Sequence, residues 1–226
     1  MLLLVTDTSG KHGSVALARA GSPPDKVNVI ESVPLVGGTF SAQLVPQISA
    51  LLAKHGFGKA DIDAFVVVSG PGSFTGLRVG LAAIKALAEI LRKPIVPLSL
   101  LEVMASASRA SGNVLAVVDA GRGEVYAGEY EVADGAARLI EERPLTRGEF
   151  LSAAQGRVVV TPDESLAGNA RQAGIATDQV PYPDAERIAR LGWHKLEAGE
   201  VVAPERLEAN YIRRPDAEIF SKRSGN

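Results

Sequence analysis

Gly70-Pro71-Gly72-Ser73-Phe74-Thr75-Gly76-Leu77-Arg78 is the stretch of this sequence that says most about its fold. It follows residues 64–68, a short continuous apolar run of the kind that forms a strand buried on both faces of a sheet. Apolar residues then recur at helical spacing to about residue 92. A strand, a glycine-rich turn and a helix in this order are typical of an α/β domain.

The glycine-rich turn itself has two interpretations. Before a helix N-terminus, such a turn can cradle an anion, because its backbone N–H groups point toward the ligand. The Gly-Lys-Ser/Thr ending of a P-loop is absent, however, so no lysine stands where it would hold terminal phosphates. A tight structural turn is therefore the favoured interpretation of residues 70–76, and phosphate binding is the alternative.

The segments around this stretch complete the first half of the chain. Apolar runs and turn residues predict strands at residues 2–5, 13–18, 27–36 and 95–98, and a helix at residues 100–108. Leu44, Ile48 and Leu51 recur on one face of a further helix, which Pro46 would kink unless it lies in the first turn. The first half is therefore α/β.

The second half opens with an echo of the first. Residues 4–8 (Leu-Val-Thr-Asp-Thr) correspond in pattern to residues 117–121 (Val-Val-Asp-Ala-Gly). In both, an apolar strand ends at an aspartate, a short turn containing glycine follows, and a strand returns. We therefore expect two related subdomains, residues 1–108 and 109–226, with the last helix a candidate to pack back on the first subdomain. A coincidental hairpin is the alternative.

The rest of the second half carries fewer signals. Thr146 and Glu149 have the spacing of a capping box and predict the start of a short helix. Residues 157–160 predict a strand, and residues 184–198 an amphipathic helix. Residues 221–226 are polar, and we expect a frayed tail.

Composition narrows the functional classes. The 226 residues, 46% of them hydrophobic, are enough for one large domain or two small ones. The 24 basic and 26 acidic residues leave a net charge of −2, so no strong field favours nucleic acid. The absence of cysteine excludes disulfides, a thiolate nucleophile and Cys-ligated metal. The lack of cysteine also suits a cytoplasmic protein, which we expect. No apolar run approaches the roughly 18 residues of a membrane span, so we expect a soluble chain without membrane association.

Asp7 and Asp119 are the candidate nucleotide-binding residues. An aspartate at a strand end before a tight turn is how the actin, Hsp70 and sugar-kinase superfamily holds phosphates and magnesium, once from each half. In such loops a glycine two positions after the aspartate lets the backbone N–H groups approach a phosphate closely. The loop after Asp7 lacks this glycine, whereas the loop after Asp119 has it as Gly121. A small actin-like ATPase or kinase is therefore an alternative function, and turn capping by both aspartates is the simpler interpretation.

Other catalytic patterns are missing. His12, His55 and His194 lie far apart, and none has a histidine four positions later that would make a metal-binding pair on a helix. The sequence contains no Gly-x-Ser-x-Gly elbow and no His-Glu-x-x-His helix, so proteolysis is not expected. We expect no catalytic residue, metal ligand or cofactor in this chain.

These segments together resemble the TsaB family along nearly the whole chain. The motif at residues 70–78 is the most specific part of the resemblance. The other matching segments are Asp7-Thr8-Ser9, Ser14-Val15-Ala16-Leu17, Leu44-Val45-Pro46, Asp119 with Gly123-Glu124-Val125-Tyr126, and Tyr211-Ile212-Arg213. Two positions depart from the family pattern, because Phe40 stands where many relatives have histidine and Gly121 where many have arginine.

The resemblance implies an α/β fold with two related subdomains of the actin-like ATPase class (ASKHA, RNase H-like). It also implies a non-catalytic scaffold subunit for formation of threonylcarbamoyladenosine on tRNA, beside the anticodon. In that family the partner TsaD carries the metal and performs the transfer, and the ATPase TsaE joins through the complex. We further expect a homodimer when the chain is alone, and weak or no direct tRNA binding, since charge is balanced and aromatic residues make up only 5%.

The helix at about residues 73–92 is the predicted docking surface. It carries one apolar stripe, made of Phe74, Leu77, Leu81, Ile84 and Leu91, and a second stripe centred roughly 110° away. A helix lying on its own sheet needs one apolar stripe, so we expect the second to meet a partner; more of the same chain is the alternative. The predicted interface, with the neighbouring helix included, consists of Gly76, Gly80, Ala83, Leu87, Ile90, Leu44 and Ile48.

Overall fold

The computed structural model describes residues 1–21 and 26–212. The chain forms two compact units. Among the described residues, the first unit comprises Met1–Val103 and Tyr182–Ala209, and the second comprises Met104–Pro181 with residues 210–212. The predicted tail at residues 221–226 lies outside the described residues, as does Arg213.

Ten strands, six α-helices and two 3-10 helices occur in the described residues. In chain order they are β1 (Leu2–Asp7), β2 (His12–Gly21), β3 (Lys26–Val36), α1 (Phe40–Lys54), η1 (Lys59–Asp61), β4 (Ala64–Gly70), α2 (Phe74–Leu91), β5 (Ile95–Ser99), α3 (Leu100–Ser106), β6 (Gly112–Gly121), β7 (Glu124–Ala133), β8 (Ala136–Thr146), α4 (Arg147–Ala153), β9 (Val158–Thr161), α5 (Glu164–Gln172), β10 (Thr177–Gln179), α6 (Ala185–Glu197) and η2 (Pro204–Arg206).

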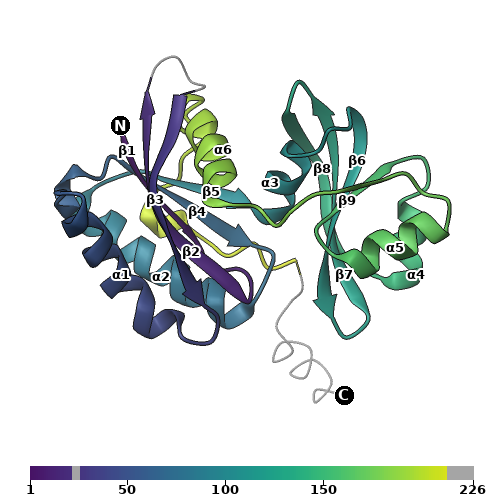
Figure 1. The fold of residues 1–226 in the computed structure, drawn as a ribbon, viewed down its shortest axis with the longest axis horizontal. Helices are drawn as coiled ribbons and strands as arrows, with labels where there is room; N and C mark the ends of the chain where they lie inside the picture. Colours follow the sequence, from purple (N-terminus) through teal and green to yellow (C-terminus); the bar gives the residue numbers. More distant parts are fainter. Residues whose placement is uncertain (22–25, 213–226) are drawn as a thin grey trace, which may run out of the picture. The chain divides into compact units, whose positions relative to one another are not determined.

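The first unit is built on a five-stranded sheet in the order β3-β2-β1-β4-β5. Strands β1, β2 and β3 pair antiparallel, and β4 and β5 run parallel to β1. Phe65 and Val67 of β4 belong to the core under α1 and α2, whereas the intervening Val66 meets Gly192 of α6. Because neighbouring residues of a strand point to opposite faces, α1 and α2 cover one face and α6 the other (Figure 1).

The second unit repeats this topology with a sheet in the order β10-β9-β6-β7-β8. Strand β6 takes the central place of β1, with β7 and β8 antiparallel on one side and β9 and β10 parallel on the other. The repeat predicted from residues 4–8 and 117–121 is therefore confirmed, since these segments lie at the ends of the two corresponding central strands. The predicted architecture is confirmed as well: the protein is α/β, with two related subdomains.

The boundary between the units differs from the sequence-based division at residues 108 and 109. Residues 104–108 belong to the second unit, and residues 182–209 return to the first. The return has a packing cause. A Cβ atom on Gly192 of α6 would stand 2.4 Å from Cγ1 of Val66, so α6 approaches the first sheet as closely as a glycine allows.

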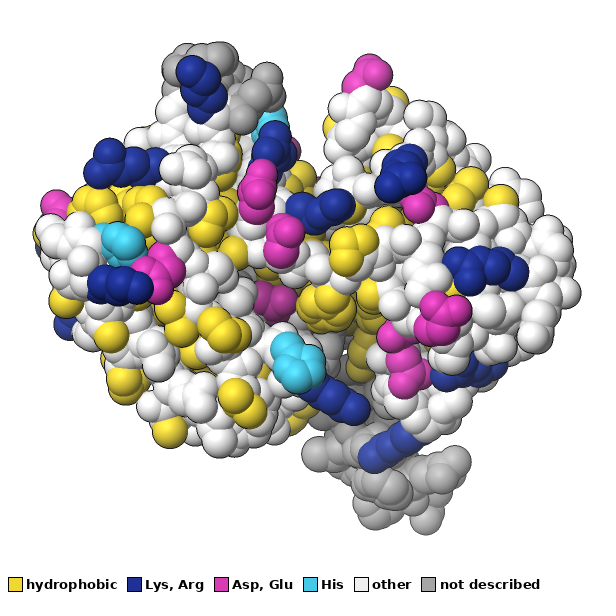
Figure 2. All heavy atoms as spheres, viewed as in Figure 1, with side chains coloured by type: hydrophobic (Ala, Val, Ile, Leu, Met, Phe, Trp, Pro, Cys, Tyr) yellow, Lys and Arg dark blue, Asp and Glu magenta, His cyan; other side chains and the backbone are white. Residues whose placement is uncertain are grey.

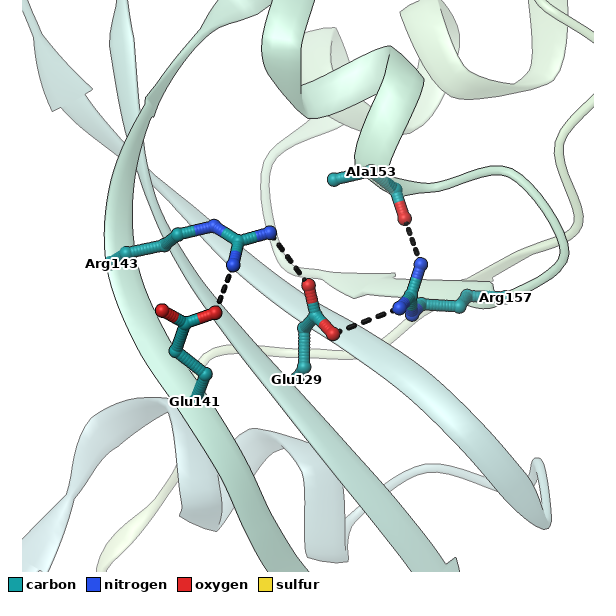
Figure 3. A network of polar contacts seen from close by, with 5 residues as sticks. All are labelled: Glu129, Glu141, Arg143, Ala153 and Arg157. Atoms are coloured by element: carbon teal, nitrogen blue, oxygen red, sulfur yellow. Dashed lines mark hydrogen bonds and ion pairs between the residues drawn. The ribbon is translucent and has the colours of Figure 1, made fainter.

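A polar network joins three segments of the second unit (Figure 3). Glu129 of β7, only 9% exposed, accepts hydrogen bonds from Arg143 of β8 at 2.8 Å and from Arg157 at 2.9 Å. Arg157 also donates to the carbonyl of Ala153 at the end of α4, and Arg143 pairs with Glu141. The carboxylate thereby ties α4 and the start of β9 to the β7–β8 hairpin.

The predicted capping box is confirmed at the start of α4. The Thr146 hydroxyl accepts the Glu149 backbone N–H, and the Glu149 carboxylate accepts the Thr146 backbone N–H at 2.8 Å. The backbone N–H and the hydroxyl of Thr146, which both donate to the Glu149 carboxylate, lower the pKa of Glu149. Within the described residues, none of the helices has both the length and the apolar character to cross a membrane.

Candidate partner-binding face

Helix α1 has a buried apolar face and an outward face with almost no charge. Its inward face consists of Phe40, Leu44, Ile48, Leu51 and Leu52. Its outward face is exposed and includes Ala42, Val45, Pro46, Ser49, Ala50 and Ala53. Lys54, at the end of the helix, is its only charged residue. The surface over α1 is accordingly mostly yellow and white in Figure 2.

Helix α2 packs beside α1 and extends this surface. Gly76 of α2 lies against Phe40 of α1, which identifies the side of α2 nearest α1. Arg78 and Glu89 project roughly 150° away from that side at 100° per residue. Exposed apolar residues of α2 lie between the side nearest α1 and the side that carries Arg78 and Glu89. One of these apolar residues, Ile90, is 78% exposed. We call the following residues the outer face: Ala42, Val45, Pro46, Ser49, Ala50, Ala53, Ala82, Ala86 and Ile90.

The predicted interface residues are divided by the structure. Gly76, Gly80, Leu44 and Ile48 are buried inside the first unit, so these residues cannot supply contact area to a partner. Ala83 and Leu87 are half-buried and pack against the core cluster, and only Ile90 is well exposed. The pair of helices predicted from the sequence is retained in our proposal below, but the face assigned to it is corrected.

The reason for this correction is the close approach of another segment of the same chain. A Cβ atom on Gly72 would stand 2.2 Å from the carbonyl oxygen of Ser9, and one on Gly76 would stand 2.2 Å from that of Thr8. A Cβ on Gly80 would stand 2.1 Å from Oγ1 of Thr8. The glycines therefore admit the turn after β1 and not a helix of a partner, as the alternative interpretation held.

The outer face was missed because the prediction assigned partner contact to the second apolar stripe of α2, whose glycines permit close approach of another segment. The signal for it was available in α1, where the exposed residues 42, 45, 46, 50 and 53 are all Ala, Val or Pro, and the exposed Ser49 among them is small and uncharged. A helix of a single unit normally places charged residues on its solvent side. The lack of charge on that side of α1 is therefore the feature that distinguishes it.

Polar groups of the glycine-rich turn before α2 form hydrogen bonds within the protein. The Ser73 backbone N–H donates to the Ser9 carbonyl at 2.6 Å, and the Ser73 hydroxyl accepts the Gly76 N–H at 3.3 Å. Two N–H groups that an anion would need are thus already bound within the protein. The geometry favours the structural interpretation of residues 70–76.

Asp7 is buried at the end of β1, with 3% of its surface exposed. Its Oδ1 accepts hydrogen bonds from the Ser9 backbone N–H at 2.8 Å and the Ser9 hydroxyl at 2.6 Å. Burial raises the pKa of the Asp7 carboxyl, and these hydrogen bonds oppose the shift. The carboxylate therefore caps the turn that follows β1, which is the simpler of the two roles expected from the sequence.

Asp119 belongs to the second unit and is exposed. Its Oδ1 accepts from Arg147 at 3.2 Å, and its backbone N–H donates to Asp163 at 2.9 Å. Throughout residues 1–21 and 26–212, no group of three or more His, Asp or Glu side chains is arranged to hold a metal ion. Of the histidines, His55 pairs with Glu31 at 2.7 Å, while His12 and His194 are exposed.

The two positions that depart from the family pattern have local explanations. Phe40 is buried and fills the space beside two glycines, since a Cβ on Gly13 would stand 2.8 Å from its ring and one on Gly76 would stand 3.1 Å from it. Gly121 has a φ of +71° in the turn between β6 and β7, a backbone conformation that glycine adopts without strain.

The chain is similar in sequence to proteins of tRNA threonylcarbamoyladenosine biosynthesis. The family model of TsaD, tRNA N6-adenosine threonylcarbamoyltransferase, matches residues 34–156, slightly more than half of the chain. The tRNA threonylcarbamoyladenosine biosynthesis protein TsaB of Bacillus subtilis is 33% identical over 232 aligned positions, covering 96% of each chain. TsaB of Haemophilus influenzae is 38% identical over 129 residues, covering 56% of this chain and 52% of that protein.

The fold of the chain is also similar to that of a solved structure. YeaZ from Pseudomonas aeruginosa superposes with a TM-score of 0.73 and 26% sequence identity, covering 93% of this chain and 99% of that one. The resemblance inferred from residues 70–78 and the flanking segments is therefore confirmed over almost the entire length. With its two-unit fold and its full-length relatives, the chain belongs to the TsaB family, which is assigned to the biosynthesis of tRNA threonylcarbamoyladenosine.

Proposed function

We propose that this chain is a non-catalytic scaffold subunit in threonylcarbamoyladenosine formation, which binds a TsaD-like catalytic subunit through the outer face. In this proposal the TsaD-like partner performs the transfer to tRNA, and a TsaE-like ATPase joins the assembled pair. The chain itself holds no cofactor and contacts tRNA weakly or not at all.

The observation that carries the proposal is the uncharged, exposed side of α1. Exposed apolar patches on soluble domains commonly mark interaction sites, because water-exposed apolar area is unfavourable unless a partner covers it. Small side chains at Ala42, Ser49 and Ala53 also allow a second helix to approach closely. The outer face is thus suited to helix-on-helix packing.

The nature of the partner is supported by the family match. The TsaD model covers residues 34–156, which include all of α1 and α2. A TsaD-like protein therefore has counterparts of both helices, and two helices from each protein would form a four-helix interface about a pseudo-twofold axis. A second copy of this chain offers the same surface, so a homodimer is expected when the catalytic subunit is absent.

The alternative of an actin-like ATPase or kinase depends on Asp7 and Asp119. Asp7 is buried and bonded to Ser9, and Asp119 is paired with Arg147. An ATPase would require both carboxylates to face magnesium and phosphate. Steady ATP hydrolysis by the purified chain, lost on Asp7→Asn, would establish the alternative in place of the scaffold.

The scaffold proposal is tested by one substitution on the outer face. Ser49→Arg places a charge in the middle of the exposed side of α1, so we expect it to abolish co-elution with the TsaD-like protein from the same organism. Ala60→Arg, on an exposed position of η1, is the matched control and should bind as the wild type does. Size-exclusion chromatography with light scattering reports both outcomes. Normal binding by Ser49→Arg would show that the interface lies elsewhere on the protein.

A further inference from the structure

The turn after β1 is linked to α2 by a short series of contacts that starts at Asp7. The Asp7 carboxylate accepts both the backbone N–H and the hydroxyl of Ser9 through a single oxygen, Oδ1. These bonds fix the conformation of Thr8 and Ser9, which are each 2% exposed. The Ser9 hydroxyl also lies 3.3 Å from the Tyr182 hydroxyl, on the segment that returns to this unit.

The backbone of this turn then holds the start of α2. The Ser9 carbonyl accepts the N–H of Ser73, the N-cap residue of the helix, at 2.6 Å. Ser73 in turn caps the helix through its hydroxyl. The position at which α2 begins is therefore set by a hydrogen bond to Ser9.

Glycine recurs at every fourth position on the side of this segment that faces the turn. A Cβ atom added to Gly72, Gly76 or Gly80 would stand only 2.1 to 2.2 Å from an atom of Ser9 or Thr8, closer than any real side chain approaches. The first two turns of α2 are consequently in direct contact with Thr8 and Ser9. A displacement of these two residues would displace the N-terminal half of α2.

We propose that Asp7 is a positioning residue for partner binding: by holding Thr8 and Ser9, it sets the position of α2 and hence of the outer face. This inference rests on the scaffold function proposed above and adds a role for a residue that otherwise suggests nucleotide binding. In this role the aspartate acts as a hydrogen-bond acceptor inside the protein rather than as a ligand of metal or phosphate.

The two roles of Asp7 respond differently to the same substitution. An acceptor role needs an oxygen at Oδ1, which asparagine supplies, whereas a magnesium or phosphate role needs the negative charge. Asp7→Asn should therefore retain partner affinity within about threefold, while Asp7→Ala should weaken it about tenfold, since a buried N–H and O–H lose their acceptor. Rescue by asparagine is the outcome that identifies positioning.

A general loss of stability must be separated from this effect. Val66→Ala removes two methyl groups beneath α6, on the opposite face of the sheet from α2, and should lower stability without changing partner affinity. Affinities for the TsaD-like protein are measured by calorimetry at a temperature where all variants are folded. Backbone amide exchange of residues 74–80 is measured in the same variants and should accelerate in Asp7→Ala only.

Each result has a defined consequence. If the wild type binds and Ser49→Arg does not, but Asp7→Ala binds as tightly as the wild type, the inference on Asp7 is wrong and the scaffold function stands. If Asp7→Asn is as weak as Asp7→Ala, the charge matters and the inference also fails. If the wild type does not bind, the proposed function itself fails.

A milder variant covers the case in which Asp7→Ala does not fold. Ser9→Ala removes the hydroxyl that bonds to Asp7 and lies near Tyr182, but it keeps the backbone N–H and carbonyl. We expect about threefold weaker partner binding and faster exchange at residues 74–80. Unchanged affinity and exchange in Ser9→Ala would contradict the positioning role.

Discussion

Oε2 of Glu129 accepts a hydrogen bond of 2.9 Å from Nη2 of Arg157, and this contact joins β7 to the segment between α4 and β9. The carboxylate is nearly buried, whereas the Arg157 side chain remains 30% exposed. Removal of the acid would leave two guanidinium groups, those of Arg143 and Arg157, beside an apolar core without their common partner. The contact therefore contributes to the stability of the second unit.

Glu129→Ala should lower the free energy of unfolding by about 1 to 3 kcal/mol. This loss is smaller than that expected for breaking a fully buried ion pair, because both arginines reach solvent. Urea denaturation followed by circular dichroism measures the change. Arg138→Ala is the control, because its pairing with Glu131 is on the surface and should be worth less than about 1 kcal/mol. Equal effects of the two substitutions would show that burial of Glu129 adds nothing.

Gly80→Arg should destabilise the isolated chain, because its Cβ would overlap Oγ1 of Thr8. A loss of about 3 kcal/mol or more is expected, at the upper end of the range for overpacked cores. Ala86→Arg lies on the exposed side of the same helix and should leave the urea midpoint nearly unchanged while it weakens partner binding. A Gly80→Arg protein as stable as the wild type would mean that α2 moves away from the turn at little cost.

Asp7→Asn should stabilise the chain at neutral pH. Burial raises the pKa of Asp7 in the folded state above its ordinary value of 3.8, so the wild-type carboxyl binds its proton more tightly when folded. Its contribution to stability is thus present at low pH and is lost as the pH rises through the folded pKa. Asparagine does not titrate, so the advantage of the variant should grow as the pH rises from the ordinary pKa of the carboxyl through its raised folded-state pKa.

The stability of wild type and Asp7→Asn is compared by urea denaturation at matched pH values. Taking the difference between the two proteins cancels the titration of all other groups. A difference that stays constant with pH would show that Asp7 has the same pKa in both states.

The isolated chain should make no threonylcarbamoyladenosine from threonylcarbamoyl adenylate and tRNA, and should bind tRNA weakly. Its net charge of −2 and its 5% aromatic content offer little for phosphate contacts or base stacking. Filter binding at physiological salt and nucleoside analysis of the tRNA provide the two readouts. Modified nucleoside in a reaction with this chain as its only protein would refute the scaffold role.

Elements in the centre of each sheet were predictable from local sequence. Residues 64–68 form a continuous apolar run because β4 is covered on both faces, and the echo between residues 4–8 and 117–121 reflects two central strands with the same neighbours. Thr146 and Glu149 were equally clear, since a capping box depends only on residues three apart. These features need no knowledge of distant contacts.

The face of α2 that meets solvent depends on contacts that sequence does not reveal. Gly76 and Gly80 permit close approach of any backbone, and only the structure identifies that backbone as Thr8 and Ser9. Likewise, the amphipathic pattern of residues 184–198 predicts a helix, α6 in the structure, without indicating which sheet that helix covers. The edge strand β8 escaped prediction because its exposed charges and apolar residues do not alternate.

The uncharged outer side of α1 has a consequence for how an assembly through it would respond to solution conditions. Salt screens ionic contacts, but it leaves apolar association unchanged or strengthens it when the anion is strongly hydrated, as sulfate is. A complex formed on Ala42, Val45, Pro46 and Ala53 would therefore persist in concentrated salt and loosen on cooling, when apolar association weakens.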